Sequence, residues 1–438
     1  MHSQKDLDAV DATAELESNW EATLDMFARF LGFVAGSLHG DQQSSRARTS
    51  LLASVFTYFT TTYLTERDIH SVAATCDTDV RRSVLSSYFL ALAALEDAKV
   101  ADISRGPASA LLSAAAQGDA SVFALFGGQG NNEVYFDELQ SLYDIYKPYV
   151  APLISTVTDE ILKPLASARE ATSFYAYGLD VSSWLAGTKP RPSIPYLASV
   201  PVAFPLIGLT QLVQYLVVCR VSGITPGQLR DRFSGATGHS QGVVSAVAIA
   251  ASTSFESFTE NTKKAIRWLF FCGFRAQEAF PVLSLEPSII DDAVEGGEGV
   301  PSPMLAVSGL ALKDLEPHIK KTNTHLPANS QLHVSLHNGP RAFVLTGPAR
   351  ALYGLVTNLR KIRAPSGLDQ SKTLFSQRKL VFSVRFLVVN APFHSEYLAS
   401  ATDKFCTEDL GGEELWTTKE LGISVYNTED GTNFLHYF

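Results

Sequence analysis

The sequence predicts an α/β protein with a helical N-terminal region and a small α/β unit inserted into a larger one. Three observations carry this prediction: helical spacing of apolar residues near the N-terminus, a serine on a strand-to-helix turn at 238–242, and a β-α-β-β-α order over 303–363. With 438 residues, the chain is long enough for two or three compact units.

Residues 1–120 form the predicted helical region, because apolar residues recur at helical spacing over 20–31 and 84–95. No chemical motif stands out there. A large α/β unit is expected over 121–302, and it resumes over 364–438.

A short apolar strand at 122–126 opens the large unit and runs directly into Gly127-Gly128-Gln129-Gly130. Such a strand end often frames a site, although a tight turn explains the same glycines. The helices expected over 131–230 include the most apolar stretch of the chain, 196–224. Two prolines and two glutamines interrupt that stretch, which favours a buried core helix over a membrane span.

The turn at 238–242 reads Gly-His-Ser-Gln-Gly and precedes a helix-like run at 243–250. Its glycines tolerate the sharp backbone that would expose Ser240, so the Ser240 hydroxyl is a candidate nucleophile. The pentapeptide alone arises by chance with a probability of roughly 0.15 in such a chain, and a purely structural turn is the alternative. Only the last residues of 229–237 suit the preceding strand.

Residues 303–363 form the predicted insertion, and their element order matches most of a ferredoxin-like unit. After it, the apolar run at 379–389 is expected to return the chain to the large unit, followed by a loop at 390–395. The elements expected in the insertion are strands at 304–308, 332–337 and 342–346 and helices at 312–323 and 349–361.

Composition argues against several classes of function. A formal net charge of −10 disfavours general nucleic-acid binding, which needs a basic face. The N-terminus lacks the apolar run of a secretory signal, and no membrane anchor is evident. The four cysteines lie far apart, which argues against a zinc site or disulfides and favours the cytoplasm: Cys76, Cys219, Cys272 and Cys406.

Local charge departs from this average over 360–385, where Asp369 is the only carboxylate. Two interpretations stay open, a solvated surface and a docking patch for an acidic partner. The basic residues are Arg360, Lys361, Arg363, Lys372, Arg378, Lys379 and Arg385.

Three motifs in this order and spacing resemble the acyltransferase family that moves acyl groups between coenzyme A and carrier proteins: Gly127-Gly128-Gln129-Gly130, the turn at 238–242, and Ala391-Pro392-Phe393-His394-Ser395. More narrowly, nearly the whole chain is similar to the acetyltransferase domain at the start of the fungal type I fatty acid synthase β subunit. The specific matches are 126–131, 235–242, 298–304 and 364–371, with weaker ones at 30–34 and 68–70. The resemblance implies the acyltransferase fold, with an α/β-hydrolase-like large subdomain and a ferredoxin-like small one.

The same resemblance implies a dyad in which His394 is the general base for Ser240, oriented by a backbone carbonyl. A lone histidine is otherwise more often structural. The backbone amide after a nucleophile commonly binds the oxyanion, which assigns that role to Gln241, and the resemblance assigns the second amide to Gln129. The implied cycle is ping-pong, from acyl-CoA to the phosphopantetheine thiol of an acyl carrier protein, with no metal or redox cofactor. A fatty acid synthase α-type subunit is the further expected partner.

Specificity is expected to depend on the helix after the turn. Family members that handle malonyl groups carry an arginine there to pair with the free carboxylate, and Cys272 takes that position here. An uncharged residue favours acetyl or another neutral short acyl group. Arg275 lies one helical turn further and could face the same side. His239 is expected as a pocket or packing residue.

Two rival functions stay open. A serine hydrolase would release the acyl group to water, although no carboxylate behind the histidine stands out. A truncated, non-catalytic assembly fragment is the second, because the family protein continues into further domains whereas this sequence stops at Phe438. Bulk fatty acid synthesis and starter-unit supply both fit the same dyad.

Overall fold

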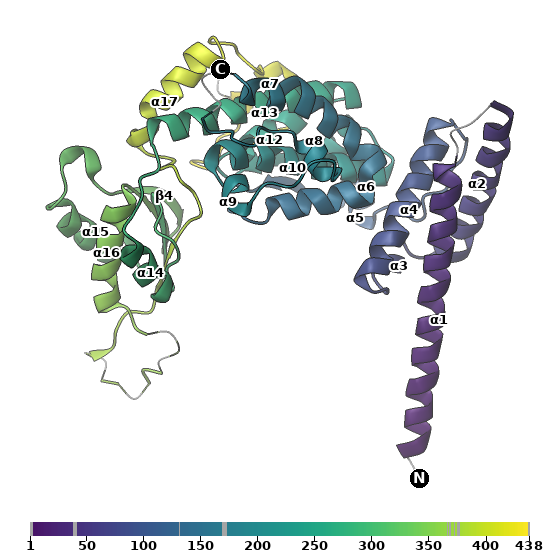
Figure 1. The fold of residues 1–438 in the computed structure, drawn as a ribbon, viewed down its shortest axis with the longest axis horizontal. Helices are drawn as coiled ribbons and strands as arrows, with labels where there is room; N and C mark the ends of the chain where they lie inside the picture. Colours follow the sequence, from purple (N-terminus) through teal and green to yellow (C-terminus); the bar gives the residue numbers. More distant parts are fainter. Residues whose placement is uncertain are drawn as a thin grey trace.

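The computed structural model describes residues 3–37, 42–130, 132–168, 173–365, 367, 369–371, 373–374 and 377–436. Three parts follow one another across the molecule: a helical N-terminal part, a central α/β body and a small α/β subdomain (Figure 1). Six residues of the motifs and of the segment 360–385 lie outside the described residues: Asn131, Ser366, Leu368, Lys372, Phe375 and Ser376.

The N-terminal part is helical, as predicted. Its core is aromatic, with Phe56, Tyr88 and Phe89 buried and the ring centroids of Phe56 and Tyr88 5.0 Å apart. Helix α4 packs against α1 and also against α6, which joins this part to the central body. The helices are α1 (Ser3–Gly36), α2 (Gln42–Tyr63), α3 (Ile69–Ala73), α4 (Thr78–Asp97) and α5 (Ala110–Gln117).

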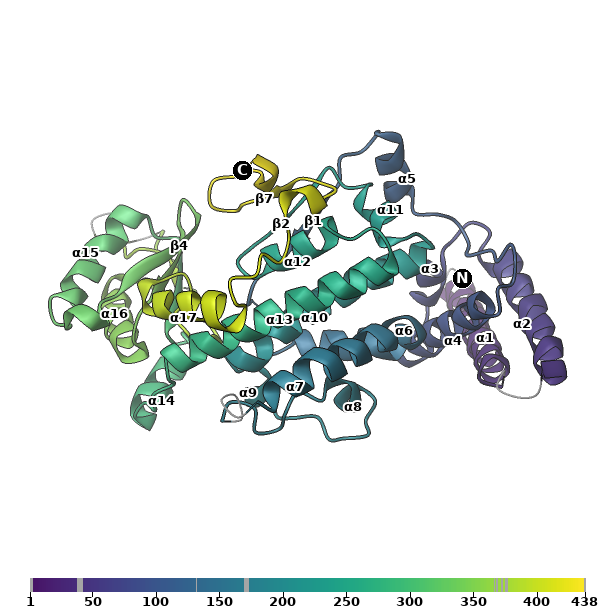
Figure 2. The same cartoon turned by 90° about the horizontal axis from the view of Figure 1, so that it is seen from above.

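The central body is built around helix α10, which packs between α6 and α13 (Figure 2). By length and composition alone α10 could cross a membrane, but most of its apolar residues are buried in the body. The prediction of a buried core helix is therefore confirmed. The helices here are α6 (Tyr135–Val157), η1 (Thr158–Leu162), α7 (Lys163–Ala166), α8 (Val181–Leu185), α9 (Ile194–Leu197), α10 (Val200–Ser222), α11 (Pro226–Arg230), α12 (Gly242–Ala250) and α13 (Phe255–Ala279).

A three-stranded parallel sheet, in the order β1-β2-β7, lies beside these helices. Strand β1 (Phe123–Phe126) pairs with β2 (Gly235–Gly238), and Ala236 of β2 lies opposite Val425 of β7 (Val425–Tyr426). The first two strands confirm the expected positions. Because β1 and β2 are parallel, the glycine-rich segment after β1 and the turn after β2 leave the sheet at the same edge.

The small subdomain is a four-stranded antiparallel sheet in the order β4-β5-β3-β6, which is the ferredoxin-like arrangement that the sequence predicts. One assignment was wrong: β6 does not return the chain to the large unit but pairs with β3 and completes the small sheet. The elements are α14 (Pro287–Glu295), β3 (Met304–Ser308), α15 (Leu312–Asn323), η2 (Ala328–Ser330), β4 (His333–Gly339), β5 (Ala342–Thr346), α16 (Ala349–Ile362) and β6 (Ser383–Phe386).

The chain then crosses back to the central body through the loop at 387–395. Short elements follow before and after β7: η4 (Glu396–Leu398), α17 (Ala399–Lys404), η5 (Phe405–Asp409), η6 (Thr418–Glu420) and η7 (Phe434–His436).

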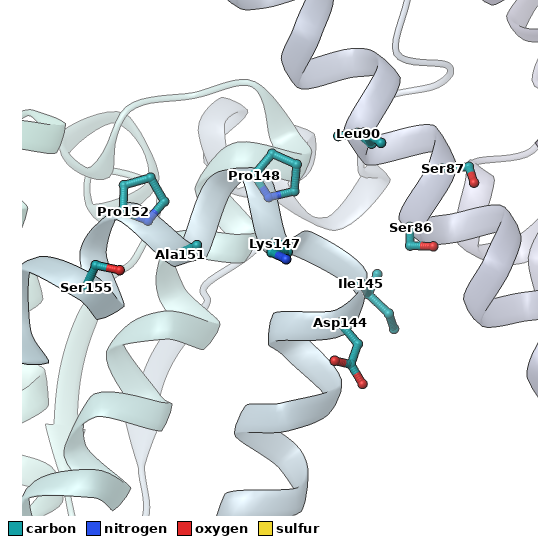
Figure 3. A pocket seen from close by; sticks show the side chains of 10 residues that line it. All are labelled: Ser86, Ser87, Leu90, Asp144, Ile145, Lys147, Pro148, Ala151, Pro152 and Ser155. Carbon is teal, nitrogen blue, oxygen red and sulfur yellow. The ribbon is translucent and has the colours of Figure 1, made fainter. Parts of the chain in front are cut away.

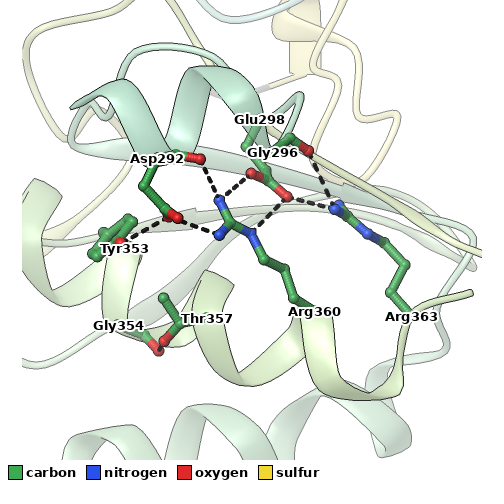
Figure 4. A network of polar contacts seen from close by, with 8 residues as sticks. All are labelled: Asp292, Gly296, Glu298, Tyr353, Gly354, Thr357, Arg360 and Arg363. Atoms are coloured by element: carbon green, nitrogen blue, oxygen red, sulfur yellow. Dashed lines mark hydrogen bonds and ion pairs between the residues drawn. The ribbon is translucent and has the colours of Figure 1, made fainter. Parts of the chain in front are cut away.

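A buried carboxylate ties the small subdomain together. Glu298 is fully buried, and its two oxygens lie 2.6 Å from Arg360 Nη2 and 2.5 Å from Arg363 Nη2 (Figure 4). Arg360 also pairs with Asp292 at 2.7 Å. Arg360 and Arg363 of the basic segment are therefore partners in internal ion pairs. Only the other basic residues of the segment remain candidates for a docking patch.

Candidate active site

The turn at 238–242 has the backbone geometry of a nucleophile elbow. Ser240 has a φ of 53°, a left-handed conformation that non-glycine residues rarely adopt. A Cβ atom on Gly238 would collide with the backbone of Gly242, and one on Gly242 would lie 2.6 Å from the carbonyl oxygen of Gly127. The two glycines are thus required by close backbone approach, and the strained turn presents the serine at the end of the sheet.

The loop at 387–395 brings a histidine to this serine. Ser240 Oγ lies 2.9 Å from His394 Nε2, within hydrogen-bond distance. Two contacts hold the loop on the central body: buried Asn132 donates to the carbonyl oxygen of Val388 at 2.5 Å, and Phe393 stacks on Phe204 with ring centroids 5.0 Å apart. The structure therefore juxtaposes the two residues that the sequence analysis paired.

His394 is suited to act as a base. Burial, and secondarily the charge of His239, lowers the pKa of His394 below its ordinary 6.5, so the ring is neutral at physiological pH. Its φ of 59° is a left-handed conformation that non-glycine residues rarely adopt. Among the described residues, no backbone carbonyl accepts a hydrogen bond from this ring, so the expected orienting carbonyl stays a prediction.

We expect the pH profile of acylation to follow this neutral histidine. A base acts only when unprotonated, so the rate should rise with pH through the lowered pKa and be flat above 6.5. Single-turnover acylation between pH 5 and 8 checks this. His239→Gln is the matched variant, because removing the neighbouring charge should move the rising limb to higher pH. An apparent pKa at or above 6.5 in the unaltered protein would contradict the assignment.

Two backbone amides near Ser240, those of Gln241 and Gln129, are the candidates for an oxyanion hole. Gln241 stands at the start of α12, where helix amides and the helix dipole favour negative charge. Gln129 follows Gly128, on which a Cβ would lie 3.3 Å from Ser240 Cβ. Among the described residues, neither backbone amide donates a hydrogen bond. The arrangement fits the predicted oxyanion hole.

A cavity of about 320 Å³ adjoins the dyad. Cys272 lines it, as predicted, and burial raises the pKa of its thiol to about 12, which keeps the sulfur neutral. The walls are mainly apolar: Phe204, Ser240, Gln241, Trp268, Cys272, Ala276, Phe393, His394, Ser395, Leu398, Ala401, Thr402 and Phe405. We call this cavity the acyl pocket.

Two residues assigned to this pocket from the sequence do not line it. The Arg275 guanidinium is held by two carboxylates: both Nε and Nη2 lie 2.7 Å from the Asp409 carboxylate, and Nη1 lies 2.8 Å from Glu278. Hydrogen bonding to Asp409 raises the pKa of Arg275, so the guanidinium stays charged and is paired with the carboxylates of Asp409 and Glu278. His239 is exposed, and its Nε2 lies 3.3 Å from Asn338 Oδ1 of β4.

Sequence reasoning missed most of the pocket wall. Trp268 and Ala276 lie four residues before and four after Cys272 on α13, so helical spacing could have placed all three on one face. Phe204 and Phe405 carry no such signal, because they come from segments far away in the sequence. The pocket in Figure 3, of about 630 Å³ between α4 and α6, contains neither member of the dyad.

Family models match most of the chain. Residues 124–373 match the family described as "Starter unit:ACP transacylase in aflatoxin biosynthesis", and residues 2–95 match "N-terminal domain in fatty acid synthase subunit beta". Together these matches cover both the helical N-terminal part and the segment that carries the elbow.

Among curated relatives, the fatty acid synthase subunit beta of Saccharomyces cerevisiae is 40% identical over 93% of this chain and 20% of its own length. The fatty acid synthase subunit beta of Schizosaccharomyces pombe is 41% identical over 95% of this chain and 19% of its own length. The fatty acid synthase beta subunit TOXC of Cochliobolus carbonum is 35% identical over 94% of this chain and 20% of its own length. The chain thus spans about a fifth of the length of these relatives.

Solved structures of similar shape include a malonyl CoA-acyl carrier protein transacylase from Clostridium perfringens. It is 17% identical, covers 73% of this chain and 75% of its own, and has a TM-score of 0.45. A second structure is a type II PKS acyl-carrier protein in complex with its malonyl-transacylase. It is 18% identical, covers 72% of this chain and 76% of its own, and has a TM-score of 0.44.

Proposed function

We propose, starting from the fact that this chain belongs to the starter unit:ACP transacylase family, that it moves an acetyl group from coenzyme A to an acyl carrier protein. The chain corresponds to the N-terminal acyltransferase region of a fungal fatty acid synthase β subunit. The observation that carries the proposal is the 2.9 Å contact between Ser240 Oγ and His394 Nε2 on a strained elbow.

The first half-reaction makes an acyl-enzyme. His394 takes the Ser240 proton as Oγ attacks the thioester carbonyl, and the amides of Gln241 and Gln129 stabilise the oxyanion. The intermediate collapses by breaking the carbon–sulfur bond, and the coenzyme A thiolate leaves with the proton that His394 holds. The second half-reaction runs the same steps in reverse order, with a phosphopantetheine thiol as nucleophile and Ser240 Oγ as leaving group.

The acyl pocket supports a neutral acyl group. A malonyl carboxylate needs a charge-assisted partner when it is desolvated. No cationic side chain lines this pocket among the described residues, and the nearby Arg275 is held by Asp409 and Glu278. Carrying a carboxylate into these walls is therefore costly, whereas an acetyl methyl group is not.

The partners and setting are part of the proposal. The acceptor is an acyl carrier protein, the assembly includes a fatty acid synthase α-type subunit, and the compartment is the cytoplasm. The acetyl group serves fatty acid synthesis or the supply of a starter unit. The chemistry needs acyl-CoA and a phosphopantetheine arm, and the dyad supplies the nucleophile and base without a prosthetic group.

One experiment separates this function from its rivals. The protein is incubated with acetyl-CoA, its mass is measured intact, and then pantetheine, holo acyl carrier protein or buffer alone is added. A transferase keeps the acetyl group in buffer and releases it rapidly to the thiols. Rapid release of free acetate identifies a hydrolase. A folded protein that acquires no mass from acetyl-CoA refutes the catalytic proposal.

Cys272→Arg is expected to change the donor preference. A guanidinium in the acyl pocket would pair with the malonyl carboxylate. With an acetyl group bound, the same guanidinium would be desolvated and unpaired, which costs free energy. We expect the ratio of malonyl to acetyl loading to rise about tenfold, equivalent to about 1.4 kcal/mol. Competition between the two donors, read by intact mass, measures this ratio. Cys272→Ser is the uncharged control, and an equal shift in both variants would contradict the electrostatic reason.

A further inference from the structure

Two aromatic side chains in contact with each other form one wall of the acyl pocket, which we call its end wall. Trp268 of α13 and Phe405 of η5 pack edge to face, with ring centroids 5.3 Å apart and an interplanar angle of 87°. Phe405 is buried and Trp268 is half-buried. Both line the acyl pocket, so this pair forms its end wall.

A second cavity lies behind that wall. It has a volume of about 370 Å³, and Trp268 is the one residue that lines both cavities among the described residues. Phe405 faces the acyl pocket, whereas its neighbour Cys406 lines the second cavity. The indole of Trp268 therefore stands between the two spaces.

The second cavity suits an aliphatic chain. Three valines of α12, the helix that starts beside the nucleophile, form one side, and leucines and aromatic rings form the rest, with Glu413 as the one charged residue among those described. Its lining is Val243, Val244, Val247, Trp268, Cys406, Leu410, Gly412, Glu413, Leu415, Trp416 and Phe434.

We propose that Trp268 is the residue that limits acyl chain length, by separating the acyl pocket from the apolar cavity behind it. The proposal rests on the function proposed above and concerns the same site. With the indole in place, an acyl chain must end inside the first cavity. Without it, a straight chain can continue into the second, and each further buried methylene favours binding by about fourfold.

The test compares chain lengths in the whole 438-residue protein. Acetyl-CoA and hexanoyl-CoA compete for the unaltered protein and for Trp268→Ala, and intact mass gives the loading ratio. We expect hexanoyl loading relative to acetyl loading to rise at least about tenfold in the variant. This is well below the upper limit, because each of the extra methylenes of hexanoyl could contribute about fourfold. A folded variant whose ratio stays within about twofold of the original overturns the proposal.

The control is Phe271→Ala, which removes an aromatic ring from the same helix but lines neither cavity. The ratio of hexanoyl to acetyl loading should not change in Phe271→Ala. An equal rise in this control would show that the effect comes from loosening of α13, and it would overturn the proposal. If circular dichroism shows that Trp268→Ala does not fold, Trp268→Leu opens the wall with less loss of packing, and the same ratios decide.

A binding measurement keeps this inference separate from catalysis. The thioethers S-ethyl-CoA and S-hexyl-CoA bind without transfer, and calorimetry compares their affinities in the same proteins. If the unaltered protein loads no acyl group, the proposed function fails, while a hexyl-specific gain in Trp268→Ala still supports the wall. If acyl loading occurs but Trp268→Ala changes neither the hexanoyl-to-acetyl loading ratio nor the relative affinity for S-hexyl-CoA and S-ethyl-CoA, only the chain-length proposal fails.

Discussion

Replacing Ser240 by alanine is expected to abolish acyl loading. The hydroxyl is the only group of the dyad that can form the ester, and Cys272, the thiol in the same pocket, is kept neutral by a pKa of about 12. Removal of the nucleophile in a serine enzyme costs on the order of 10⁶-fold in rate. Intact mass after incubation with acetyl-CoA should show no added acetyl group, and carrier-protein acylation should fall to background.

The dyad also predicts how a second substitution combines with the first. His394→Ala should slow loading by about 10²- to 10⁴-fold, and Ser240→Ala with His394→Ala should be no slower than Ser240→Ala alone, because the two residues act as one unit. Unchanged circular dichroism spectra show that the fold is kept. Persistent loading of Ser240→Ala, at any residue, would contradict Ser240 as the nucleophile.

Replacing Glu298 by alanine should destabilise the small subdomain. The change leaves Arg360 and Arg363 facing an emptied, buried position. Removing one partner of a buried ion pair costs about 3–5 kcal/mol, and the partial exposure of both arginines argues for the lower end of this range. Urea unfolding should show the loss, and Glu298→Gln should recover part of it through hydrogen bonds.

Glu286→Ala is the matched control for this stability effect. Glu286 pairs with Arg350 in the same subdomain at 2.6 Å, but both side chains are largely exposed. Such pairs contribute about 0–1 kcal/mol, so this variant should unfold at nearly the original urea concentration. Equal losses in the two glutamate variants would show that burial of Glu298 does not matter.

The elbow could be predicted because its requirements are local. A serine between glycines, after a short strand and before a helix, determines a turn that only small neighbours permit, and Gly238 and Gly242 meet that need. The insertion was likewise visible in the order of its strands and helices. His394 was placed by resemblance alone, since nothing in the sequence encodes its distance to Ser240, 154 positions earlier.

Errors arose where partners are distant in sequence. The apolar run at 379–389 marks a strand but not the sheet it joins, and β6 joins the small one. Arg275 lies one turn after Cys272, and helical spacing could not tell that Asp409 would bind its guanidinium and that it would not line the pocket. The end wall of the acyl pocket depends on Phe405, which only the fold brings to Trp268.

The crossing at 387–395 has a mechanical consequence. Ser240 belongs to the central body, whereas His394 lies on the segment that leaves β6 of the small subdomain. Asn132 and Phe204 hold that segment against the central body, so loss of either contact would change the distance between base and nucleophile. The distance between base and nucleophile therefore depends on how the segment after β6 docks on the central body, and not on the elbow alone.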